Sequence, residues 1–175
     1  MTIGPKKQKG AVLIIGLLLM IVLTLIGLTS MRTTRLETMM STNAKESAIA
    51  FEAAEAAQRD AEQLIEDSVS IVAFAGANGL LGIDDVEPDY QDPASWGSGN
   101  SQQYSETFAD VATQPRFIVK YIGEISSDPT QSPIIGDYGS TAGNPTVSLF
   151  RVTSRGTGRN DSAVALIQTY YGKIY

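Results

Sequence analysis

The first part of the chain carries one uninterrupted apolar run. The 21 residues from Ala11 to Met31 include no charge, and 13 of them are Leu, Ile or Val. About 20 helical residues cross a hydrocarbon core of about 30 Å. On insertion scales the 13 large aliphatic residues favour the membrane by roughly 4 to 8 kcal/mol. A buried soluble helix of this length would normally show a polar side, so the pattern predicts a membrane helix.

From Arg32 to about Ile71 the helical period continues, but the pattern becomes two-sided. Apolar and small residues share one arc: Leu36, Met40, Ser47, Ala50, Phe51, Ala54, Ala57, Ala61, Ile65 and Val69. Charged residues share the opposite side: Lys45, Glu52, Glu55, Arg59, Asp60, Glu66 and Asp67. No Pro or Gly stands between Met31 and Ala75, which favours one continuous helix over two helices with a hinge near Ser30. We expect Ala50, Phe51, Ala54, Ala57 and Ala61 to be buried under the C-terminal sheet.

After Gly76 the chain turns to loop chemistry and then to strand patterns. β-branched and aromatic residues predict strands over 116–125, 146–154 and 163–171, and the last two flank a Gly/Asn turn typical of a hairpin. Three antiparallel strands can bury one face on the helix. We therefore predict an α+β fold class with one long N-terminal helix packed on a small antiparallel sheet. The expected segments are 1–10 as a leader, 11–31 as the transmembrane half of the helix, 32–75 as its amphipathic half and 76–175 as a C-terminal α+β head.

Composition and charge narrow the possible chemistry. The chain has no Cys and no His, which excludes disulfides, a Cys nucleophile, a His base and zinc sites built on these ligands. The formal charge is −6, and beyond Gly10 there are 10 basic against 19 acidic residues. An acidic body argues against a nucleic-acid partner. No two carboxylates form an evident acid/base pair, so we expect neither an enzyme nor a cofactor.

The short N-terminal stretch is basic and ends in a small residue. Lys6, Lys7 and Lys9 precede Gly10, and no small-residue cleavage site follows the apolar run. An ordinary secretory signal, with an apolar stretch of about 7–15 residues before such a site, fits poorly. The basic leader should stay in the cytoplasm while the body crosses the membrane.

These features together resemble a type IV prepilin, and within that group the PilX-type minor pilins. The stretches that carry the resemblance are KKQKGAVLIIGLLLMIVLTLIGLTSMRTTRLETMMSTNA, AFEAAEAAQRDAE and FRVTSRGTG. The resemblance implies that prepilin peptidase cuts between Gly10 and Ala11 and methylates Ala11. It also implies that the helix first rests in inner-membrane lipid and then packs with the major pilin, with other minor pilins and, at the pilus tip, with a tip adhesin.

One position departs from the resemblance. Major pilins carry Glu at the fifth position after the cleavage site, where it pairs with the amino terminus of a neighbouring subunit, and this chain has Ile15 there. Either the subunit sits at the tip, primes assembly and needs no such pair, or it docks by packing alone. A tip pseudopilin of a type II secretion system, which shares this absence, and a single-pass anchored periplasmic binding domain are the alternative functions.

Two weaker signals lie in the loop region. Asp84, Asp85, Glu87 and Asp89, followed by Asp92, are candidate calcium ligands, because calcium prefers six to eight oxygens. Their spacing is not that of an EF-hand, and a solvated acidic turn is the simpler interpretation. Trp96 is either an exposed aromatic anchor for a partner or a residue packed against the head.

Overall fold

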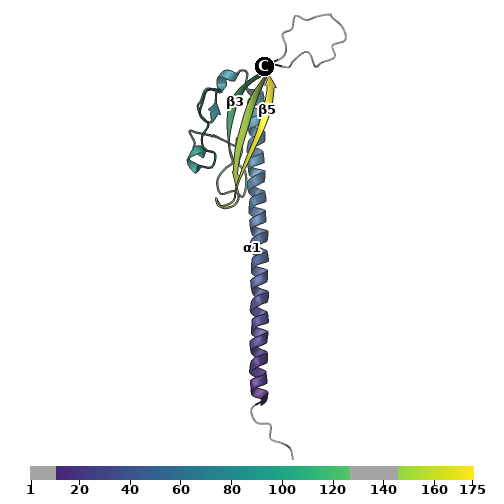
Figure 1. Cartoon of the computed structure of the whole chain (residues 1–175). Coiled ribbons are helices and arrows are strands. Elements are labelled where there is room, and N and C mark those ends of the chain that lie inside the picture. The colour runs from purple at the N-terminus through teal and green to yellow at the C-terminus, as the bar shows by residue number, and fades with distance from the viewer. Residues whose placement is uncertain (1–10, 127–145) are drawn as a thin grey trace, which may run out of the picture. The chain divides into compact units, whose positions relative to one another are not determined.

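The computed structural model describes residues 11–126 and 146–175 (Figure 1). The predicted leader 1–10, including Gly10, lies outside the described residues. One long helix, α1 (Ala11–Asp67), is followed by two short 3-10 helices, η1 (Ile71–Ala73) and η2 (Pro93–Trp96). The five strands are β1 (Leu80–Leu81), β2 (Gln102–Gln103), β3 (Arg116–Ser126), β4 (Thr146–Thr157) and β5 (Val164–Ile174). The chain divides within α1 into two compact units, Met1–Ala44 and Lys45–Tyr175, and we call the second the head unit.

In the first unit, α1 presents apolar side chains to all sides from Ala11 to Met31. Its threonine hydroxyls are satisfied within the helix: for example, Thr24 Oγ1 donates to Met20 O at 2.7 Å and Thr38 Oγ1 donates to Thr34 O at 2.9 Å. Such bonds to the preceding turn let threonine stand in an apolar helix without an unpaired donor. The helix predicted over 11–31 is confirmed, and no break occurs near Ser30.

The head unit is built on a mixed sheet with the order β1-β3-β4-β5, and β2 also pairs with β3. β3, β4 and β5 are antiparallel neighbours, as predicted. The sequence patterns did not predict β1 and β2, which have two residues each and lie between glycines and polar residues. Because β1 runs parallel to β3, the sheet is mixed and not purely antiparallel.

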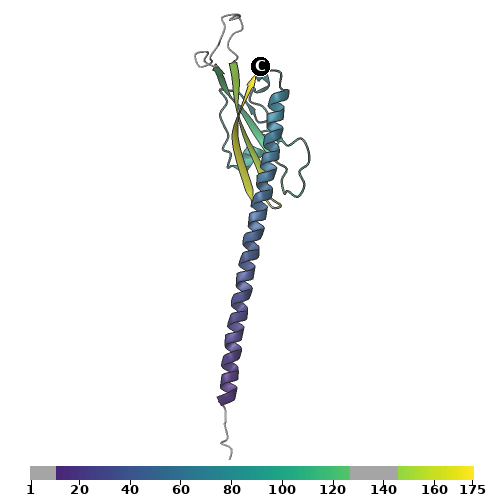
Figure 2. The same ribbon diagram turned by 90° about the vertical axis from the view of Figure 1, so that its right-hand side faces the viewer.

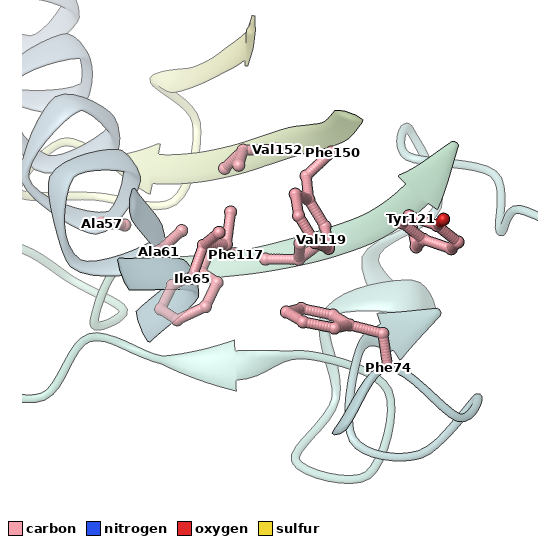
Figure 3. Packing of buried hydrophobic residues seen from close by; sticks show 9 residues of the cluster. All are labelled: Ala57, Ala61, Ile65, Phe74, Phe117, Val119, Tyr121, Phe150 and Val152. Atoms are coloured by element: carbon pink, nitrogen blue, oxygen red, sulfur yellow. The ribbon is translucent and has the colours of Figure 1, made fainter. Parts of the chain in front are cut away.

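The core lies between one face of α1 and the sheet. The turned view shows the C-terminal part of α1 crossing one face of the long strands (Figure 2). The core side chains are Ala57, Ala61, Ile65, Phe74, Phe117, Val119, Tyr121, Phe150 and Val152 (Figure 3). The Phe150 ring is central among the aromatic residues, with its centroid 4.7 Å from that of Phe74 and 5.4 Å from that of Tyr121.

The helix approaches β4 closely, and Gly156 makes this approach possible. A Cβ added at Gly156 would lie 2.2 Å from Ala50 O, 2.4 Å from Ala54 N and 2.9 Å from Ala53 Cβ. No side chain larger than hydrogen fits between the strand and the helix backbone here. The alanines on this face are therefore required by the close contact and not only by helix propensity.

This close contact corrects the predicted burial of α1. Ala50, Ala54, Ala57 and Ala61 are buried, as expected, but Phe51 is 52% exposed and the predicted burial of its ring is wrong. Compared with the predicted face, the buried face of α1 is rotated away from Phe51. It includes Ala53 and also Glu46. The physical reason is that β4 leaves no room for a large ring at the level of Gly156.

The end of α1 is a second correction. The helix ends at Asp67, four residues before the predicted Ile71 and eight before residue 75. Lys173 Nζ from β5 donates to Ile65 O at 2.9 Å, to Glu66 O at 2.6 Å and to Ser68 O at 2.6 Å. A lysine can satisfy the last carbonyls of a helix in place of a glycine cap. Because this cap comes from a strand about a hundred residues later, no local signal marks it.

Candidate assembly site

The apolar part of α1 is the first candidate surface. Among the described residues, α1 is the one helix long and apolar enough to cross a membrane, by length and composition. Its large side chains are exposed, and Ile15 is 59% exposed. Ala11, the predicted first residue of the mature chain, lies in α1. A helix with this surface can be covered by lipid or by other apolar helices.

The loop after β1 covers the outer face of β3 and β4, the face away from α1. Lys120 on β3 is 8% exposed, and its Nζ donates to Gly82 O at 3.3 Å, to Ile83 O at 3.4 Å and to Asp85 O. Arg151 on β4 pairs with the Glu87 carboxylate. These two cations hold the loop on the sheet.

The candidate calcium ligands have separate roles in this loop. The Asp85 carboxylate accepts from Gly82 N at 2.7 Å, and Asp89 accepts from Gln91 N at 2.9 Å. Glu87 is in the ion pair with Arg151, and Asp84 is exposed. No group of three or more His, Cys, Asp or Glu side chains in the described ranges could hold a metal. Asp85 and Asp89 therefore fix the turns of the loop, and Glu87 pairs with a cation of the chain itself.

Trp96 takes the second of its two predicted positions. It is 5% exposed, and its Nε1 donates to Tyr90 O at 2.9 Å. Burial raises the pKa of the Tyr90 hydroxyl, since the phenolate would lose its hydration beneath the loop. Trp96 thus closes the loop on itself at Tyr90 and is not available as an exposed anchor.

Glu46 is a structural residue that sequence reasoning missed. This carboxylate lies buried on α1 and accepts from Arg159 N at 2.7 Å in the turn between β4 and β5. The space is tight, because a Cβ at Gly158 would lie 2.6 Å from Glu46 Oε2. Neither a sequence motif nor the charge pattern distinguishes Glu46 from the exposed acidic residues of the helix.

The second candidate surface is the edge strand β5, which pairs with β4 on one side and with no described strand on the other. Its helix-facing side chains contact α1. Gln58 on α1 donates from Nε2 to Thr169 Oγ1 at 2.7 Å and to Glu62 Oε1 at 3.2 Å. The Tyr171 hydroxyl donates to the Glu66 carboxylate, and this bond raises the pKa of Tyr171. On the outer face of the sheet, a cavity of about 470 Å³ is lined by Tyr90, Gln91, Pro93, Arg155, Asp161, Val164 and Leu166.

Comparison with known families covers almost the whole chain. The family model described as type IV pilus assembly protein PilX C-term matches residues 38–173, and the model described as PilX N-terminal matches residues 9–59. No curated protein and no solved structure matches the chain. The two family matches together include the whole of α1, strands β1 to β4, and β5 up to Lys173.

Proposed function

The chain belongs to the PilX family of type IV pilus assembly proteins, and we propose from this premise that it is a minor pilin that primes assembly at or near the pilus tip. The family gives the chain a structural role in the pilus. The apolar α1 fits a membrane-anchored pilin. The place in the fibre and the priming role are our inference.

Ile15 is the observation that carries the proposal. A carboxylate at this depth costs about 2.5–3.5 kcal/mol in lipid, so a subunit keeps one only where a partner offsets the cost. Ile15 offers an apolar, exposed side chain instead. A subunit that begins a fibre has no earlier subunit to pair with, and for such a subunit an apolar residue at this position is the stable choice.

We further propose that prepilin peptidase cuts between Gly10 and Ala11 and methylates the new amino group. The leader would remain in the cytoplasm and the head would face the periplasm, because the basic residues Lys6, Lys7 and Lys9 precede the apolar run. After extraction from the inner membrane, α1 would pack with the major pilin and other minor pilins, and the head would contact a tip adhesin.

The test combines a deletion with a pair of matched variants. Deletion of the protein should sharply reduce the number of surface pili while the major pilin remains abundant in the membrane. Ile15→Glu should give no more pili than the natural protein. Ile14→Glu is the control for the burial of a charge, because it carries the same carboxylate one residue away from the pairing position.

Immunogold labelling of sheared fibres locates the subunit. Label at fibre ends supports the tip position, and label spread evenly along fibres would defeat it. An increase in pili for Ile15→Glu but not for Ile14→Glu would also contradict the proposal, since it would show that this subunit normally lacks a pair that it needs.

A further inference from the structure

The two edges of the sheet are built differently. One edge consists of the two-residue strands β1 and β2. The other is β5, which has 11 residues, pairs with β4 along its whole length without a register shift and has no second partner among the described strands (Figure 1). A long, regular edge presents a row of unpaired N–H and C=O groups.

One hydrogen bond in the turn between β4 and β5 identifies the backbone groups of β5 that face outward. In the turn before β5, Gly158 N donates to Ala163 O at 2.9 Å. Because hydrogen-bonded and non-hydrogen-bonded pairs alternate in an antiparallel ladder, every second residue from Val164 onward turns its N–H and C=O away from β4. These residues are Val164, Leu166, Gln168, Tyr170, Gly172 and Ile174.

This edge lacks the usual protection against strand addition. Natural edges carry Pro, a bulge or an outward lysine. β5 contains no Pro, and its one charged residue, Lys173, is bound to carbonyls at the end of α1. The part of the chain that the structure describes therefore leaves this edge open to another extended segment.

The surroundings of β5 define the chemistry of that segment. On the outer face, Val164, Leu166, Tyr170 and Ile174 are exposed, and the 470 Å³ cavity lies beside the first two. On the helix side, Glu62 and Glu66 lie near Tyr171. A strand added here would turn alternate side chains toward the apolar face and toward the two carboxylates.

We propose that the β5 edge binds an extended segment of a partner protein, which adds a strand to the sheet and carries apolar and basic residues in alternation. A second copy of this chain is a poorer occupant, because its own β5 edge would bring Glu62 and Glu66 toward the same carboxylates. The inference goes beyond the proposed function, since it does not depend on the subunit's place in the fibre.

Binding of a defined peptide to the full chain in detergent tests the proposal. The probe is an eight-residue peptide of alternating Val and Lys. Gln168→Pro removes one outward N–H without removing a bond to β4, and Gln168→Ala removes the same side chain but keeps that N–H. We expect Gln168→Pro to weaken binding about tenfold or more and Gln168→Ala to have little effect.

Two further peptides test the chemistry without any change to the protein. A peptide with alternate N-methyl groups cannot form the strand ladder, and a Val–Glu peptide reverses the charge. Both should bind at least about tenfold more weakly than the Val–Lys peptide. Equal binding of the N-methyl peptide would mean that charge alone attracts the probe. Equal binding of the Val–Glu peptide would mean that basic residues are not needed for binding. Either result overturns the proposal.

A measurement of self-association distinguishes a partner protein from a second copy of this chain as the occupant of the β5 edge. If the full chain forms dimers that Gln168→Pro abolishes and Gln168→Ala retains, the edge binds a second copy and the proposal is wrong. If no peptide binds while deletion of the protein still reduces pilus number, the edge proposal fails and the role in pilus assembly stands.

Discussion

Gly156→Ala should destabilise the head unit, although Ala normally suits a strand better than Gly. Replacing a glycine at a compatible position stabilises a protein by about 0.4–1 kcal/mol through the unfolded chain. At Gly156 the added Cβ would lie 2.2 Å from Ala50 O and 2.4 Å from Ala54 N. Both atoms belong to the helix backbone, so no side-chain rotation relieves the contact.

The magnitude follows from the shift that the new atom requires. An ordinary contact needs α1 to move by about 1 Å from β4, and a gap of 0.5–1 Å forfeits about a quarter to a half of the dispersion energy of the atoms involved. Overpacking of this kind costs about 1–3 kcal/mol. We expect a loss near the upper end, because the shift separates the helix from the sheet along the alanine face.

Trp96 provides the assay, because it is the single Trp of the chain and is buried in the head unit. Denaturant unfolding of the full chain in detergent, followed by Trp fluorescence, should give a lower midpoint for Gly156→Ala. Gly99→Ala is the control, since no atom lies within 4 Å of its added Cβ. Equal midpoints for the two variants, or a higher one for Gly156→Ala, would refute the close contact.

Three other outcomes follow from the structure, and a fourth follows from the sequence. Phe51→Ala should change the unfolding free energy by less than about 1 kcal/mol, against about 3–5 kcal/mol for a core Phe, in the same fluorescence assay. Lys120→Met should release the loop over the outer face of the sheet and make it the first site of limited proteolysis. The contribution of the Tyr171–Glu66 bond to thermal stability should be lost as the pH rises from 10.0 through the raised pKa of Tyr171, so the melting temperature of Tyr171→Phe, which has no hydroxyl to bind Glu66, should fall less steeply over that range. Gly10→Val should leave a full-length precursor in the membrane, as measured by intact mass, and a processed variant would contradict the proposed cleavage.

The parts of the fold that the sequence predicts are those with a local signal. The apolar run from Ala11 to Met31 predicts its helix by length and composition alone. The three long strands follow from alternation and β-branched residues, and β4 exceeds its predicted end by only three residues. An apolar run or a strand alternation depends only on residues that are close together in the chain, so the sequence alone is enough to recognise it.

The features of the fold that the sequence pattern mispredicts depend on residues far away in the chain. The ring of Phe51 looks like a core residue by its period, but the room on that face is set by Gly156, about a hundred positions later. The end of α1 is set by Lys173 in the last strand. The partner of Glu46 is likewise a backbone N–H in the turn before β5. For the candidate site, the same limit applied to Trp96, whose two positions could be separated only by the structure.

The contact between α1 and the sheet has a consequence for a subunit that must keep its head on its helix during assembly. Glu46 binds the turn before β5 at one end of the contact, and Lys173 binds the helix carbonyls at the other. Gln58 binds Thr169 between them. Since these bonds are spread along the helix, sliding α1 over the sheet would strain all of them together. The small residues at Gly156 permit the close approach, and the three bonds make the helix–sheet contact resist displacement along the helix.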